Sequence, residues 1–126
     1  MSTVYLEKFQ LYVPTLAVAR DIFAESLELE VIKNTSKTVW FQMNENTKLM
    51  CWPKDISKHD IHSYSSSINI FADTNTIQKA HKVLMKKGYI VKLSKLNLNN
   101  KQSLELYIQT ISPLTLITVS DYGWHK

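Results

Sequence analysis

Hydrophobic and polar residues alternate near the start of the chain, where residues 9–13 read Phe-Gln-Leu-Tyr-Val. This alternation is typical of a strand that is covered on one face. A proline then ends the pattern, and the hydroxyl of Thr15 can cap a helix. Apolar residues recur at helical spacing afterwards, which predicts a helix over about residues 15–28. Three short apolar segments predict strands at 30–33, 38–43 and 48–52.

The same order of elements returns in the second half of the chain. Residues 53–65 lose the periodicity and gather turn-forming and charged types, which predicts a connector. An alternating segment at 67–72 predicts a strand, and Asp73 can cap a helix that ends at Gly88. Three more strands are predicted at 89–93, 104–109 and 114–119. We therefore expect one α+β domain over residues 1–126, with half-repeats at about 7–52 and 66–121.

Two βαβββ halves can complete each other. A lone half leaves one sheet face bare, whereas two halves joined edge to edge can form a cupped mixed sheet with the helices on its outer face. If Phe9, Leu11 and Val13 pack on the helices, the alternate residues line a cleft. Rings and amides of this kind are the usual lining of a small-molecule site. The predicted ligand-binding residues are Tyr12, Trp40, Gln42, Trp52, Asn69, Phe71, Glu105, Tyr107 and Gln109.

Two alternatives concern the same face. The rings of Trp40, Phe71 and Tyr107 would also fit a closed core or a dimer interface. Glu105 is the only carboxylate expected on the cleft face, and Lys8 is the only cation. We expect Glu105 to be partly wet and paired with Lys8 or with an amine of a ligand, rather than to act as an acid or base.

Several segments resemble proteins of the glyoxalase/bleomycin-resistance/dioxygenase (vicinal oxygen chelate) superfamily. Residues 11–31 resemble the opening strand, turn and amphipathic helix of these proteins, although Glu28 stands in a leucine-glycine-leucine step that usually has glycine. Residues 88–91 resemble the family's glycine-x-x-valine step, and residues 112–113 resemble a degenerate form of its late turn. The resemblance covers residues 7–121 and implies the paired βαβββ fold.

The resemblance also implies where a metal would be held. In metal-dependent members, the first and the last strand of each half each supply one ligand, which is His, Glu or occasionally Gln. The matching positions here are Lys8, Ser67, Met50 and Thr118, which do not form a set of metal ligands. The histidines lie elsewhere, at positions 59, 62, 81 and 125. We therefore expect no metal, no cofactor and no catalytic residue.

The amino-acid composition and net charge limit the kinds of partner that the protein is expected to bind. The net charge is +4, but the lysines are spread along the chain and Arg20 is the only arginine. Because arginine is the usual choice for bidentate contacts to phosphate and guanine, we do not expect nucleic-acid binding, and the charge favours an anionic partner. The sequence contains no apolar run of about 18 residues and no signal peptide. Cys51 is expected to be a buried, unreactive thiol in a cytoplasmic protein.

We interpret these features as a metal-free protein that sequesters a small organic molecule, aromatic or anionic, in the manner of resistance proteins. We expect a homodimer without a membrane partner, and we favour a binding protein over an enzyme. The main alternative is an interaction or regulatory protein with a filled cleft, whose lysine-rich helix at 79–87 binds a protein or an anionic partner. A metal-dependent lyase or dioxygenase with displaced ligands is a weaker alternative.

Overall fold

The computed structural model describes residues 3–53, 65–98, 101–110 and 114–122. The first half contains β1 (Lys8–Val13), α1 (Leu16–Ala19), the π-helix η1 (Arg20–Ser26), β2 (Glu30–Asn34), β3 (Val39–Gln42) and β4 (Lys48–Pro53). The second half contains β5 (Ser65–Phe71), α2 (Thr74–Lys86), β6 (Ile90–Leu98), β7 (Lys101–Thr110) and β8 (Leu114–Ser120). Most of the predicted connector lies outside the described residues.

Each half forms a four-stranded mixed sheet, and the two sheets have the same topology. Their strand orders are β1-β4-β3-β2 and β5-β8-β7-β6. In each sheet the first strand runs parallel to the last, and the other pairs are antiparallel. The predicted α+β class and the paired βαβββ units are therefore confirmed.

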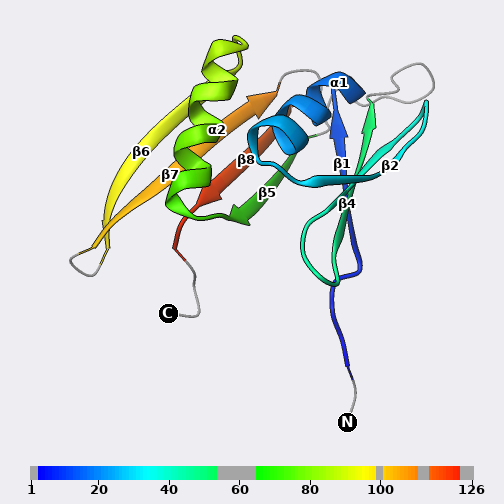
Figure 1. Cartoon of the computed structure of the whole chain (residues 1–126), viewed down its shortest axis with the longest axis horizontal. Coiled ribbons are helices and arrows are strands. Elements are labelled where there is room, and N and C mark those ends of the chain that lie inside the picture. The colour runs from blue at the N-terminus through cyan, green and yellow to red at the C-terminus, as the bar shows by residue number, and fades with distance from the viewer. Residues whose placement is uncertain (1–2, 54–64, 99–100, 111–113, 123–126) are drawn as a thin grey trace.

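The core lies between the sheets and the helices, which cover the same side of both sheets (Figure 1). In β1, Leu11 and Val13 are buried and Phe9 packs against the core, as the alternation predicts. The ring of Phe23 in η1 meets the ring of Phe41 in β3, with centroids 5.5 Å apart. Both phenylalanines are fully buried, so the first helix and its sheet share one apolar contact layer.

The Cys51 thiol is buried in β4, as expected from the sequence. Burial raises the pKa of this thiol to about 12, because the thiolate would lose its hydration. The reactive thiolate is therefore scarce at neutral pH.

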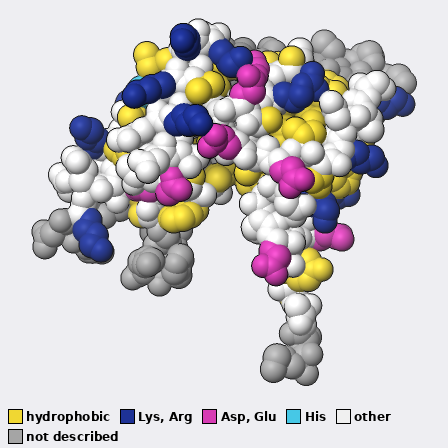
Figure 2. All heavy atoms as spheres, in the orientation of Figure 1, with side chains coloured by type: hydrophobic (Ala, Val, Ile, Leu, Met, Phe, Trp, Pro, Cys, Tyr) yellow, Lys and Arg dark blue, Asp and Glu magenta, His cyan; other side chains and the backbone are white. Residues whose placement is uncertain are grey.

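Polar contacts join the two halves along their helices, over which Figure 2 shows basic and acidic side chains near one another. The Tyr89 hydroxyl donates a hydrogen bond to Asp21 at 2.6 Å, and the Lys87 ammonium lies 3.5 Å from the same carboxylate. Burial opposes the ionisation of Asp21, but these contacts hold its pKa below the usual value. Lys79 lies 2.6 Å from Glu28. These two lysines of the 79–87 segment therefore pair with carboxylates of the first half.

The helices of the two halves begin with matching caps and are followed by residues with a positive φ. Thr15 and Asp73 each accept a hydrogen bond from the amide three residues further on, at 3.1 and 2.7 Å, which confirms both predicted caps. Gly88 ends α2 with a φ of 87°, as predicted for a helix stop. Glu28 follows η1 in the same left-handed region, with a φ of 62°. It is the position where the resembling family usually has glycine.

The substitution Glu28→Gly is expected to raise the free energy of unfolding by about 0.5–1 kcal/mol, because a side chain is strained at positive φ. The exposed contact with Lys79 offsets only part of this gain. Urea titration measures the change. The matched control is Gly88→Ala, which meets open space but imposes the same strain and is expected to lower stability by about 1 kcal/mol. A loss of stability in Glu28→Gly would contradict the prediction.

Candidate functional site

The predicted site residues all lie on the sheet faces that point away from the helices. Residues paired across a ladder project to the same side, so the strand register assigns each residue to a face. We call this side the open face and divide it by sheet. The first patch comprises Lys8, Gln10, Tyr12, Glu30, Lys33, Trp40, Gln42, Lys48, Met50 and Trp52. The second patch comprises Ser67, Asn69, Phe71, Ile90, Lys92, Ser94, Glu105, Tyr107, Gln109, Leu116, Thr118 and Ser120.

Trp40 of β3 is flanked by two cations in the first patch. The Nζ atoms of Lys8 and Lys33 each lie over its ring, 5.4 Å from the centroid. The indole Nε1–H donates to the Thr38 hydroxyl at 3.2 Å, which fixes the orientation of the ring. Trp40 is only half-buried, so part of its surface is accessible to a ligand.

A second indole lies on β4, beside Tyr12 in the β1–β4 pairing. The Nε1–H of Trp52 donates to Oε1 of Gln10 at 3.0 Å. Met50 is buried among these side chains and pairs with Gln10 on one side and Trp40 on the other. The two indoles of the first patch are therefore held by hydrogen bonds, which lowers the entropy cost of binding a ligand on them.

The side-chain amide of Gln42 donates to the backbone carbonyl of Asn44. One amide hydrogen of this predicted ligand-binding residue is thus used to hold the turn between β3 and β4. Its carbonyl oxygen is the group that a ligand donor could use.

The second patch is organised around Glu105, and the expected partial wetness of this residue and its expected pairing with Lys8 were wrong. Glu105 is 9% exposed rather than partly wet, and its carboxylate accepts hydrogen bonds from the hydroxyls of Tyr107 and Tyr122, the latter at 2.7 Å. Lys8 lies instead over Trp40 in the other sheet. These hydrogen bonds to the carboxylate raise the pKa of both phenols.

Tyr122 was missed because it follows the last strand, where the alternating pattern has ended. Asp121 continues the pairing with β7 beyond the end of β8, since its amide donates to the Leu104 carbonyl at 3.3 Å and the Leu104 amide donates to its carboxylate at 3.0 Å. This pairing places the phenol of the next residue beside Glu105. A short acidic side chain directly after the strand, which can accept a backbone hydrogen bond, was the available sequence signal.

The charge of the open face also differs from the expectation that Lys8 and Glu105 are its only ions. A register shift between Val31 and Lys33 places Lys33 opposite Trp40. The pairings of the other strands add further charged residues, which are Glu30, Lys48 and Lys92. These residues fall inside the predicted strands, but the pattern at these positions did not assign their side chains to a face.

Several rings of the open face are exposed. Phe71 is 65% exposed, Tyr12 is 41% exposed and Tyr107 is 40% exposed. The exposure of Phe71 and Tyr107 contradicts a closed core that includes them within the described part of the chain, whereas Trp40, the third ring of that alternative, is half-buried. The Thr115 hydroxyl of β8 donates to the Tyr12 carbonyl of β1 at 2.9 Å, which joins the two sheets.

The centre of the open face carries a poor set of metal donors. Gln10 pairs with Met50 in the first sheet, and Asn69 pairs with Thr118 in the second. Among the described residues, no three His, Cys, Asp or Glu side chains are grouped closely enough to hold a metal ion. Of the four histidines, only the one on α2 falls in the described ranges. The residues present do not fit a divalent cation of the kind that the resemblance implies.

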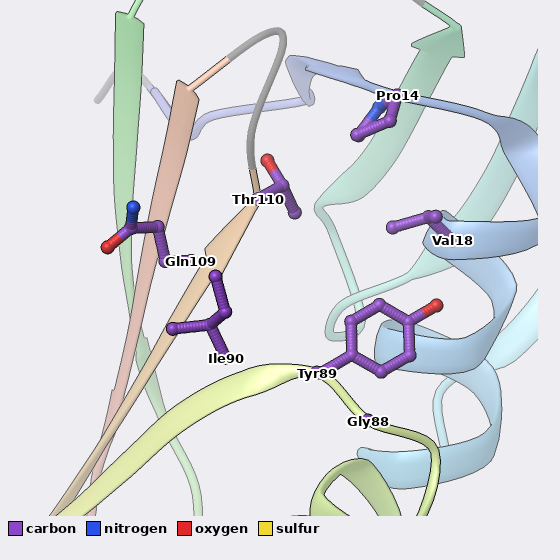
Figure 3. A pocket seen from close by; sticks show the side chains of 7 residues that line it. All are labelled: Pro14, Val18, Gly88, Tyr89, Ile90, Gln109 and Thr110. Carbon is purple, nitrogen blue, oxygen red and sulfur yellow. The ribbon is translucent and has the colours of Figure 1, made fainter.

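A shallow groove lies apart from most of the predicted residues, between the first helix and the start of β6 (Figure 3). It encloses about 210 Å³. Pocket volumes of about 300–1,000 Å³ are usual for small-molecule sites. Its lining is almost wholly apolar and comes from the ends of elements: Pro14, Val18, Gly88, Tyr89, Ile90, Gln109 and Thr110. Only Gln109 is shared with the predicted set, so we place the candidate site on the open face.

Comparisons by sequence and by structure give different results. By sequence, the chain matches no family model and no curated protein. By structure, it is similar to lactoylglutathione lyase from Agrobacterium tumefaciens, at 15% identity, a TM-score of 0.63 and 96% coverage of both chains. It is also similar to oxidase ChaP-H1, at 8% identity and a TM-score of 0.72, with 98% of this chain and 100% of that chain covered.

A third neighbour is a glyoxalase/bleomycin resistance protein/dioxygenase from Alicyclobacillus acidocaldarius, at 14% identity and a TM-score of 0.58. The match covers 94% of this chain and 91% of that chain. None of the helices in the described ranges is long and apolar enough to cross a membrane. The nearly complete coverage by several such structures shows that the chain has the paired βαβββ fold of the glyoxalase/bleomycin resistance/dioxygenase-type proteins.

Proposed function

We propose that the chain is a binding protein that captures a small, partly aromatic molecule on its open face without a metal. The observation that carries this proposal is the make-up of the first patch. Trp40 and Trp52 are half-buried and held by hydrogen bonds, and Tyr12 lies beside them with an exposed ring. Flat apolar groups gain about 25 cal/mol per Å² when they leave water for such a surface.

Nearby polar groups can orient a molecule that stacks on these rings. The Gln42 carbonyl oxygen lies in the first patch, and Asn69 offers an exposed amide in the second. A few polar groups beside aromatic rings are the arrangement found in ligand sites. The ligand-binding roles of the remaining predicted residues rest on the same argument.

The names of two structural neighbours refer to a lyase and an oxidase. Such chemistry is not the function we propose, because Lys8, Ser67, Met50 and Thr118 stand where metal-dependent relatives are expected to have ligands. A lysine ammonium is a cation at neutral pH and repels a metal ion, and a thioether is a poor ligand for the hard divalent ions.

The test is calorimetric titration of the protein with a panel of small aromatic compounds. Each titration is made once in the presence of EDTA and once with Zn²⁺, Ni²⁺ or Fe²⁺. We expect at least one compound to bind with the same affinity in both conditions, because the rings and amides need no metal. Binding that requires an added metal, or tight stoichiometric uptake of a metal on the open face, would overturn the proposal.

A separate observation supports the homodimer that the sequence analysis expects. Val4, Tyr5 and Leu6 form an extended apolar segment ahead of β1, and Val4 is 89% exposed. Consecutive exposed apolar residues of this kind often mark an interface. We propose that a second copy of the chain covers this segment in a homodimer. Native mass spectrometry of the purified protein reports the subunit number and any small molecule that copurifies, so it tests the homodimer and the bound ligand together.

A further inference from the structure

We propose that the open-face ligand is an aromatic acid, whose anionic group is held by Lys8 and Lys33 while its ring stacks on Trp40. This inference rests on the proposed function and adds the chemical class of the ligand. The anionic group can be a carboxylate or a phosphate, because both carry negative charge on oxygen atoms that can pair with an ammonium group.

The geometry around Trp40 brings two cations to one ring. Lys8 reaches it from β1 and Lys33 reaches it from β2, which are the two edges of the first sheet. Because each Nζ lies 5.4 Å from the same centroid, the two ammonium groups are no farther apart than twice that distance. Both lysines are exposed, and their long side chains can swing toward a shared anion.

Lys8 and Lys33 differ from other lysines of the protein in their ion pairing. Lys79 and Lys87 each pair with a carboxylate of the first half. Within the described ranges, by contrast, neither Lys8 nor Lys33 forms an ion pair with a carboxylate. Lys48 adds a third positive charge, because it is paired with Lys8 in the β1–β4 ladder. Like charges placed opposite each other in a sheet are unfavourable, so an anion bound between them relieves repulsion.

A bound aromatic acid displaces the ammonium groups of Lys8 and Lys33 from the ring of Trp40. Ammonium groups over an exposed indole are held weakly. An aromatic ring can replace them on the indole face, and the displaced ammonium groups can then pair with the acid carried by that ring. A cationic ligand is disfavoured at this position, because three lysines of the first patch, Lys8, Lys33 and Lys48, outnumber Glu30, its one carboxylate among the described residues.

The test compares 2-naphthoate with 2-naphthamide, which share a ring and differ in charge. Calorimetric titrations are made at low salt and at about 0.5 M salt, where charge attraction is screened. We expect the acid to bind about fivefold or more tightly than the amide at low salt and to lose this advantage at high salt. Each of Lys8→Gln and Lys33→Gln is expected to weaken acid binding about two- to fivefold and to leave amide binding unchanged.

Two further variants control for fold and for net charge. Lys95→Gln removes the same charge from β6, where Lys95 pairs with Leu104 on the helix side, and is expected to bind both compounds as the unmodified protein does. Lys33→Arg keeps the charge and is expected to retain the preference for the acid. Thermal unfolding of each variant verifies that it is folded.

The outcomes separate this inference from the proposed function. Equal binding of acid and amide, with no effect of salt or of the lysine substitutions, would overturn the assignment of an acid and leave the aromatic site intact. Failure of both compounds to bind at millimolar concentration would count against both. An effect of Lys95→Gln as large as that of Lys33→Gln would show that only the overall charge matters and would also overturn the assignment.

Discussion

Phe23→Ala is expected to lower the free energy of unfolding by about 3–5 kcal/mol, whereas Phe71→Ala is expected to change it by less than about 0.5 kcal/mol. The two residues have the same side chain in opposite surroundings. Phe23 is fully buried against Phe41, so its removal leaves a cavity between η1 and the first sheet. Phe71 is 65% exposed on the open face, where truncation removes few contacts.

Equilibrium unfolding in urea, followed by circular dichroism, measures both changes. The comparison tests the assignment of faces, because the helix side must be the core and the open face must be accessible. A loss of several kcal/mol in Phe71→Ala would mean that the open face is filled, as in the alternative of an interaction protein. A small loss in Phe23→Ala would contradict the placement of the core.

The second prediction concerns the affinity for a neutral aromatic compound. Trp40→Leu is expected to weaken the binding of 2-naphthamide by about ten- to thirtyfold, because tryptophan anchors typically dominate the binding energy of a site. A neutral probe keeps this result independent of the lysines. The comparison variant is Phe71→Leu, which is expected to weaken binding much less than Trp40→Leu does, because the Phe71 ring is 65% exposed and lies in the other sheet.

Calorimetry gives the affinities, and thermal unfolding verifies that both variants are folded. Equal affinities for Trp40→Leu and the unmodified protein would remove Trp40 from the site. A large loss in Phe71→Leu alone would move the site to the second patch.

Much of the fold could be predicted because short-range physics decides it. The alternation at residues 9–13 gave the buried face of β1 correctly, and the Thr15 and Asp73 caps follow from local hydrogen bonding. The restart of the pattern predicted the second half and therefore the paired sheets. Glu28 adopts the same positive φ as Gly88, so the turn after the helix is retained without its usual glycine.

The extent of the β6–β7 hairpin could not be predicted in the same way. It continues to Leu98 and resumes at Lys101, beyond the predicted ends at 93 and 104. Polar residues occupy much of this extension, and pairing with the neighbouring strand keeps them in the sheet. Tertiary pairing of this kind is not visible in local periodicity.

The candidate site was predicted as a face but not as a set of contacts. Alternation places Trp40, Tyr107 and Glu105 on one side of their sheets, and the structure agrees. The Tyr122 partner of Glu105 lies beyond the last strand, and the position of Lys33 depends on a strand irregularity. Neither feature has a periodic signature, which is why the charge of the open face was underestimated.

The most direct test of the central claim is a titration of the ¹⁵N-labelled protein with 2-naphthamide in EDTA, followed by NMR. We predict that the indole N–H signals of Trp40 and Trp52 shift together and saturate, while the backbone amides of Val18 and Tyr89 at the groove stay in place. Shifts confined to the groove, or shifts of the indole signals that require an added divalent metal, would contradict an open-face site that binds aromatic molecules without a metal.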